Sequence, residues 1–151
     1  MSRRGNGLVY LFIVLGLAVV IAPLMSAMPS KGQRRKAAVR DQARHYGLHV
    51  SIRPPPDIPP RFQFAADAEL VCYQKLLPKA LQCAGREHRY VYVGGQWQSI
   101  FDEQHPPDWV EKLPDGAVLA ELSERNASIF WDERNGLEGL DQLHQAIEFI
   151  E

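Results

Sequence analysis

The sequence lacks the motifs that are typical of common enzymes. It has neither the Gly-x-x-x-x-Gly-Lys-Ser/Thr loop nor the Gly-x-Gly-x-x-Gly turn that bind nucleotide phosphates, and it has no Gly-x-Ser-x-Gly turn of a serine hydrolase. Its two cysteines, Cys72 and Cys83, form no Cys-x-x-Cys pair of the kind that binds zinc. The sequence therefore predicts no catalytic residue, no cofactor and no metal site.

Charge is also missing from one long segment near the N-terminus. Residues 5–30 hold no acidic or basic side chain, and residues 8–22 read LVYLFIVLGLAVVIA. A helix of about 20 apolar residues crosses the roughly 30 Å hydrocarbon core of a bilayer. No other part of the sequence has an apolar run of that length. We therefore predict a transmembrane helix over residues 8–28, after a short tail at residues 1–7.

A cleaved signal peptide is the alternative reading of this segment. Arg3 and Arg4 resemble the positive start of such a peptide, but the apolar run is long and the nearest small-residue site places Met25 three residues before the cut. Cleavage would yield a secreted domain, in which Cys72 and Cys83 would be expected to form a disulfide bond.

Basic residues on the two sides of the span predict its orientation. Two precede it, and seven follow within residues 30–53: Lys31, Arg34, Arg35, Lys36, Arg40, Arg44 and Arg53. Short flanks rich in Lys and Arg stay in the cytoplasm. We therefore predict a single-pass protein of the bacterial inner membrane whose C-terminal part is cytoplasmic.

Charge changes sign along the part that follows the span. Residues 30–53 carry seven basic residues and one acidic residue, whereas residues 54–151 carry eight basic and seventeen acidic residues. We expect Lys31, Arg34, Arg35, Lys36, Arg40 and Arg44 to contact the anionic inner leaflet, and the proline-rich residues 54–60 to space the acidic domain away from it. An acidic domain also repels nucleic acid, so we expect none to bind.

The remaining pattern predicts an α+β protein. Residues 29–53 read as a basic juxtamembrane helix, with Ser30 and Gly47 as its caps, and a short strand. Residues 61–151 read as a small antiparallel-sheet domain with a packing helix at its C-terminus. Predicted strands cover residues 70–77, 89–93, 96–101, 117–123 and 128–132, and the pair Gly94-Gly95 predicts a hairpin that places Tyr92 opposite Trp97. Asn135 and Glu138 resemble a capping box. The helix that follows places these residues on one face: Leu137, Leu140, Leu143, Ile147 and Ile150.

Two groups of side chains are candidates for function. Tyr92, Trp97 and Trp109 could form an exposed aromatic surface for a partner. His105, Asp108 and Trp109 could line a pocket for a small ligand, although Pro107 and Asp108 also suit the first turn of a helix.

The N-terminal quarter resembles the YajC-type accessory subunit of the bacterial Sec translocon. The matching parts are the span at residues 8–28, Pro29, and the basic run from Lys31 to Lys36. The Gly-Asp-x-Val-x-Thr-x-Gly-Gly stretch of that family is absent here. The whole chain also resembles single-pass membrane proteins of proteobacteria. These resemblances imply a membrane protein partner in an envelope or secretion complex, and they supply no site residue.

The sequence thus favours a membrane-anchored, non-enzymatic interaction module. One alternative is a small-ligand sensor or enzyme that uses the pocket near His105, Asp108 and Trp109. The other is the secreted domain described above.

Overall fold

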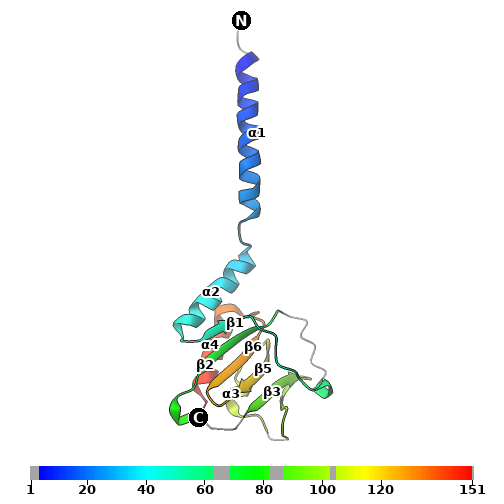
Figure 1. Ribbon diagram of the computed structural model, residues 1–151, viewed down its shortest axis with the longest axis vertical. Helices are drawn as coiled ribbons and strands as arrows, with labels where there is room; N and C mark the ends of the chain where they lie inside the picture. The colour runs from blue at the N-terminus through cyan, green and yellow to red at the C-terminus, as the bar shows by residue number, and fades with distance from the viewer. Residues whose placement is uncertain (1–3, 63–68, 82–86, 103–104, 151) are drawn as a thin grey trace. The chain divides into compact units, whose positions relative to one another are not determined.

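The computed structural model describes residues 4–62, 69–81, 87–102 and 105–150. It divides the chain into two compact units, Met1–Arg34 and Arg35–Glu151. The described residues form four α-helices and one six-stranded antiparallel sheet (Figure 1), which confirms the predicted α+β class.

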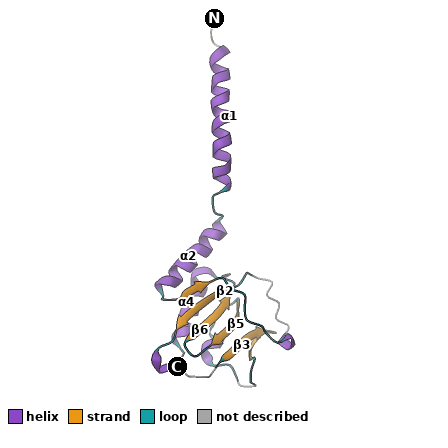
Figure 2. Ribbon diagram, in the orientation of Figure 1, coloured by secondary structure: helices purple, strands orange, loops and turns teal. Residues whose placement is uncertain are grey.

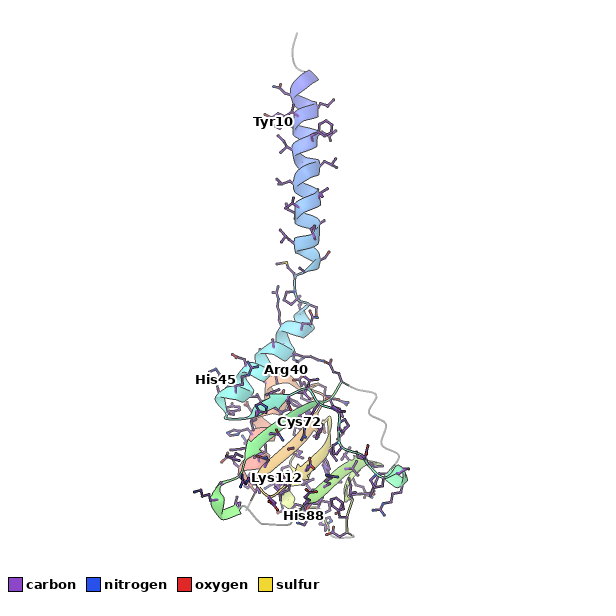
Figure 3. The ribbon with its side chains drawn as sticks, viewed as in Figure 1. Tyr10, Arg40, His45, Cys72, His88 and Lys112 are labelled. Atoms are coloured by element: carbon purple, nitrogen blue, oxygen red, sulfur yellow. The ribbon has the colours of Figure 1, made fainter. Side chains whose placement is uncertain are left out.

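The first unit contains α1 (Arg4–Ser26), the apolar helix. Its side chains from Asn6 onward stand out on every side of the helix and are exposed (Figure 3). The stretch Asn6–Ser26 has the length and composition to cross a membrane. The helix begins earlier than the predicted span of residues 8–28 and ends at Ser26, two residues before its predicted end.

All six strands of the second unit belong to one sheet (Figure 2). They are β1 (His49–Ser51), β2 (Val71–Leu76), β3 (His88–Val93), β4 (Gln96–Ser99), β5 (Ala117–Leu122) and β6 (Asn126–Trp131). Their order across the sheet is β1-β2-β6-β5-β3-β4, and every neighbouring pair is antiparallel. The sheet therefore ends in β1 on one side and β4 on the other.

The β3–β4 hairpin has the predicted turn. Gly94 and Gly95 both have positive φ, 63° and 85°, as a two-residue type I′ turn requires. Tyr92 lies opposite Trp97, and their ring centroids are 5.4 Å apart. The turn thus sets the register that brings the two aromatic side chains together.

One face of the sheet packs against helices. Leu140, Leu143 and Ile147 of α4 (Gly136–Glu148) are buried there, together with Trp109 and Val110 of the short α3 (Asp108–Glu111). The closest approach joins Trp131 to α4 at Gly139, where an added Cβ would lie 2.5 Å from the indole ring. A glycine is therefore required at position 139, because any side chain would displace Trp131.

The opposite face of the sheet holds a second cluster, which includes Cys72, Leu119 and Phe130. Phe62, from the 3₁₀ turn Pro60–Phe62, is buried in it, and Ile58 packs against it. The proline-rich residues 54–60, for which we predicted a spacer, therefore contact the sheet through Ile58.

The helix α2 (Lys31–His45) begins with a capping box. The Gln33 amide N–H donates to Ser30 Oγ at 3.2 Å, and the Ser30 amide N–H donates to Gln33 Oε1 at 2.9 Å. The helix ends before Gly47, which has a φ of +73°. Both predicted ends are confirmed.

The C-terminal half of α2 packs on the sheet domain. Val39 and Ala43 are fully buried in the helix-side core, and Tyr46 packs against it. These side chains recur every three to four residues and so lie on one face. Through this narrow face, the part of α2 from Arg35 onward belongs to the second unit.

Two details of α4 differ from the sequence prediction. Asn135 precedes the helix but makes no side-chain capping bond. Its backbone is helical (φ −87°, ψ 0°), whereas a capping side chain needs an extended backbone to reach the first turn. Leu137, predicted on the packing face, is 50% exposed because the contact with the sheet begins one turn later, at Leu140.

Replacing Leu143 by alanine should lower the free energy of unfolding by roughly 2–5 kcal/mol, because it leaves a cavity at a fully buried site. Leu137→Ala, on the same helix, is the matched control and should change it by less than about 0.5 kcal/mol. Urea titration of the full chain in detergent, followed by tryptophan fluorescence, measures both. Equal losses for the two variants would mean that α4 does not pack as described.

Candidate functional site

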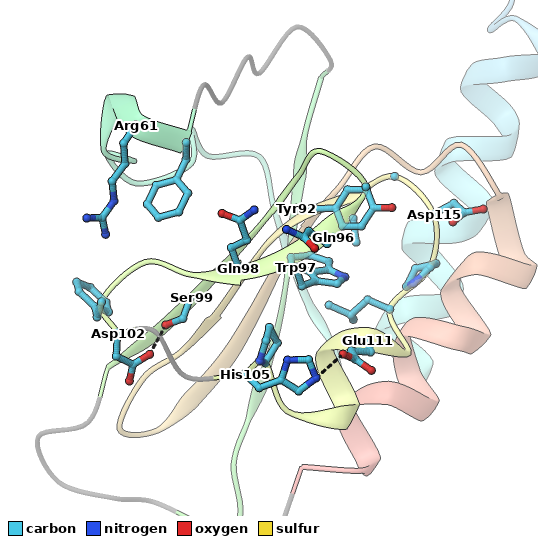
Figure 4. A pocket seen from close by; sticks show the side chains of 18 of the residues that line it. Arg61, Tyr92, Gln96, Trp97, Gln98, Ser99, Asp102, His105, Glu111 and Asp115 are labelled. Atoms are coloured by element: carbon cyan, nitrogen blue, oxygen red, sulfur yellow. Dashed lines mark hydrogen bonds and ion pairs between the residues drawn. The ribbon is translucent and has the colours of Figure 1, made fainter.

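An open groove of about 1410 Å³ surrounds β4 (Figure 4). All four residues of β4 line it. The other lining groups come from the β3–β4 hairpin, the segment before β5 and the loop after β6. The groove is also lined by Arg61, Phe62, Phe101, Asp102, His105, Pro106 and Glu111. The groove is therefore built from parts of the chain that are far apart in the sequence.

Both faces of β4 contribute to this groove. Trp97 packs against the helix-side core. Successive side chains of a strand point to opposite faces, so Gln96 and Gln98 lie on the other face. A space lined by both faces of one strand must pass around its free edge. The groove therefore gives access to the backbone of β4.

Polar side chains in the groove form two close pairs. His105 Nε2 lies 3.3 Å from Glu111 Oε1, and Ser99 Oγ donates a hydrogen bond to Asp102. Asp108, which could have paired with His105, instead begins α3 directly after Pro107. Of the predicted ligand pocket, the structure thus brings only His105 to the groove.

The predicted aromatic surface is divided between groove and core. Tyr92 is 44% exposed and Trp97 is half-buried, and both line the groove. Trp109 is 5% exposed and meets the ring of Tyr90 edge-on in the helix-side core. Tyr92 and Trp97 are therefore the members of this set that a partner could reach.

The basic residues predicted to contact lipid fall into two groups. Lys31, Arg34 and Arg35 are exposed. The others form ion pairs: Lys36 with Glu69 at 3.1 Å, Arg40 with Glu133 at 2.8 Å, and Arg44 with Asp41 at 3.9 Å. Lys36 and Arg40 thus tie α2 to the sheet domain.

A buried carboxylate, which sequence reasoning missed, holds α2 in place. The Glu133 side chain is fully buried, and Arg40 donates to both of its oxygens at 2.8 Å. The Tyr73 hydroxyl donates to Glu133 Oε1 at 2.6 Å. The bond to Glu133 raises the pKa of Arg40, while burial raises the pKa of Tyr73, so Arg40 stays charged and Tyr73 stays neutral. No local sequence pattern signals this cluster, because Arg40 and Glu133 are 93 residues apart.

A second contact between α2 and α4 contains a histidine. The ring of His144 stacks on Tyr46 with centroids 4.4 Å apart, and its Nδ1 atom is buried without a hydrogen-bond partner. The Tyr46 hydroxyl donates to Asp141 at 2.7 Å. Burial and the nearby charge of Lys75 lower the pKa of His144, although Asp141 opposes them. The fold therefore favours the neutral imidazole.

The described part of the chain contains one cysteine, Cys72. Cys72 is buried, and burial raises the pKa of its thiol, which makes it a poor nucleophile. Cys83 lies outside the described residues, and so does any bond between the two cysteines. Residues 4–62, 69–81, 87–102 and 105–150 hold no group of three or more His, Cys, Asp or Glu side chains that could bind a metal ion.

Comparisons with protein-family models, with curated proteins and with solved structures found no match to this chain.

Arg40→Met should lower the free energy of unfolding by about 2–4 kcal/mol, because the buried carboxylate of Glu133 loses its positive partner. Arg44→Met is the matched control on the same helix, and its exposed pair should contribute less than about 0.5 kcal/mol. Urea titration compares the two. In a Glu133→Gln background the effect of Arg40→Met should shrink, and an unchanged effect there would contradict the pairing.

The stability of the protein should fall as the pH drops below about 6.5, the ordinary pKa of histidine. The pKa of His144 is lower in the folded state, so the unfolded chain binds a proton first and acid favours unfolding. His144→Phe keeps the stacked ring without the titrating group. Urea titrations between pH 7 and pH 5 should therefore show a smaller loss for His144→Phe than for the unaltered chain. Equal slopes for both proteins would refute this role of His144.

Proposed function

We propose that this chain is a single-pass membrane protein that presents a non-enzymatic interaction domain in the bacterial cytoplasm. The observation that carries the proposal is α1, whose described apolar side chains are all exposed. Exposing that much contiguous apolar surface to water is strongly unfavourable. A bilayer removes it from water, and the stretch Asn6–Ser26 is long enough to cross one.

The proposed orientation depends on the flanking charges. The seven basic residues after the span outnumber the two before it, and such an excess stays in the cytoplasm. Lys36 and Arg40 also serve the fold, which leaves Lys31, Arg34 and Arg35 as the exposed cations near the start of α2. These three are the groups that we propose contact anionic lipid.

The shape and lining of the groove support an interaction role rather than catalysis. Its volume of about 1410 Å³ exceeds the roughly 300–1,000 Å³ of pockets that enclose small molecules. His105 and Glu111, the acid–base pair in the groove, are both exposed to solvent, whereas catalytic groups usually lie in enclosed sites that exclude water. An elongated partner suits this surface better than a small ligand. Such a partner would agree with a role in an envelope or secretion complex.

Reporter fusions at the C-terminus test the membrane placement. Alkaline phosphatase, which is active only outside the cytoplasm, should be inactive, and a fluorescent protein that matures in the cytoplasm should be bright. The full-length chain should stay in the membrane pellet after alkaline carbonate extraction.

Other outcomes of that experiment identify the alternatives. An active phosphatase fusion on a chain shortened by the length of the apolar segment would show a cleaved signal peptide and a secreted domain. An active fusion on an uncleaved, carbonate-resistant chain would show the inverted orientation. Lys31→Gln with Arg34→Gln should weaken the orientation signal while leaving Arg35, Lys36 and Arg40 to hold the fold.

A further inference from the structure

One edge of β4 has no neighbouring strand among the described residues, because β4 is the last strand of the sheet. In a hairpin with a two-residue turn, the residues that flank the turn are hydrogen-bonded to each other, and bonding then alternates along the pair. Val93 pairs with Gln96, so Gln96 and Gln98 bond to β3. The Ile100 amide N–H donates to the Arg89 carbonyl at 2.9 Å, which confirms this parity.

The remaining residues of β4, Trp97 and Ser99, direct their N–H and C=O groups away from β3. No residue that the structure describes forms a backbone hydrogen bond with them on that side. Directly after β4, Arg61 donates to the carbonyl of Ile100 at 2.6 Å. The open edge is therefore short, and it runs from the Gly94-Gly95 turn to the end of β4 at Ser99.

The groove keeps this edge accessible and supplies different chemistry on its two faces. Trp97, Tyr92 and Glu111 lie on the helix side, whereas Gln96 and Gln98 lie on the other. Side chains of an added strand would alternate between the two faces. An extended peptide would therefore place every second side chain beside the aromatic pair and the carboxylate.

The charges in the groove favour a basic peptide. Three carboxylates line it, from Asp102, Glu111 and Asp115. Of the two lining arginines, Arg134 is already paired with Asp132, and Arg61 is held by the Ile100 carbonyl. In Figure 4, Arg61 lies at the Asp102 end of β4, away from Glu111 and Asp115. Glu111 contacts the exposed ring of His105 at 3.3 Å, and Asp115 is exposed near Arg134. A lysine or arginine of the partner would replace the histidine beside Glu111.

We propose that β4 binds an extended peptide segment of a partner protein, which adds to the sheet edge through the backbone of Trp97 and Ser99. The peptide carries a basic side chain toward Glu111 and Asp115 and an apolar one onto Trp97. This is strand addition, in which main-chain hydrogen bonds give affinity and alternate side chains give specificity. The inference depends on the proposed interaction role and names the surface and the class of its partner.

A selection with displayed peptides tests the proposal. The full chain in nanodiscs is presented to a phage library of random twelve-residue peptides, with empty nanodiscs for subtraction. We expect the selected peptides to share an alternating pattern with a lysine or arginine two residues from an apolar side chain. Their synthetic, labelled forms are then titrated against the full chain by fluorescence anisotropy.

Two variants at one position separate backbone pairing from other contacts. Ser99→Pro removes the outward N–H without touching the ladder to β3, and proline is tolerated at such an edge. Ser99→Ala keeps the N–H, and both variants lose the hydroxyl that bonds to Asp102. Binding to Ser99→Pro should be roughly tenfold weaker than binding to Ser99→Ala. Glu111→Gln with Asp115→Asn should weaken basic peptides and reduce the salt dependence of binding.

Peptides that bind Ser99→Pro and Ser99→Ala equally well would overturn the proposal. So would a selection in which no peptide binds the protein-containing nanodiscs better than the empty ones. If Ser99→Pro does not fold by circular dichroism, peptides methylated at alternate backbone nitrogens make the same test on the unaltered protein. Two sets of alternate nitrogens can be methylated, and in an added strand one set donates its N–H groups to β4. Methylation of at least one of the two sets must therefore abolish binding. These results are independent of the reporter fusions, so the peptide site and the membrane placement can fail separately.

Discussion

The carboxylate of Glu133 is the point at which three parts of the domain meet. It lies in the loop between β6 and α4, and it accepts hydrogen bonds from Arg40 of α2 and Tyr73 of β2. Its backbone adopts a φ of +61°, which is unfavourable for a residue with a side chain. A buried charge with a strained backbone persists only where its partners are held in place. The positions of α2 and of the start of α4 therefore depend on each other.

Because of this dependence, the basic segment that begins at Lys31 has a structural role in addition to its charge. The residues from which we predicted the orientation include two, Lys36 and Arg40, that form ion pairs with the sheet domain. A substitution made to test orientation at Arg40 would also leave Glu133 unpaired. Lys31 and Arg34 are positions at which the two effects can be separated, whereas the guanidinium of Arg35 lies beside Gly136.

Local features of the fold were predictable from the sequence, and contacts between distant residues were not. The Gly94-Gly95 turn, the Ser30–Gln33 cap and the burial of Leu143 follow from residues that are neighbours in the chain. Asn135 failed as a cap because the left-handed backbone at Glu133 and Gly136 sets the entry to α4, which composition alone does not reveal.

The candidate site shows the same division. The aromatic pair Tyr92 and Trp97 was predictable from the hairpin, and its exposure followed only from the position of β4 at the sheet edge. That position results from β3 pairing on its other side with β5, a contact between strands that are far apart in the chain. Trp109 is buried in the core, rather than exposed as predicted, because α3 packs beside α4. This too is a contact between distant parts of the chain.

An open sheet with two edges can polymerise, since each edge can pair with a copy of itself. Here β1 spans three residues and is followed shortly by prolines from Pro54 onward, which cannot donate a ladder hydrogen bond. The other edge, β4, spans four residues and ends where Arg61 occupies the Ile100 carbonyl. Neither edge is long enough to template a fibril. The domain can thus keep an open sheet while offering few backbone groups through which its copies could pair edge to edge.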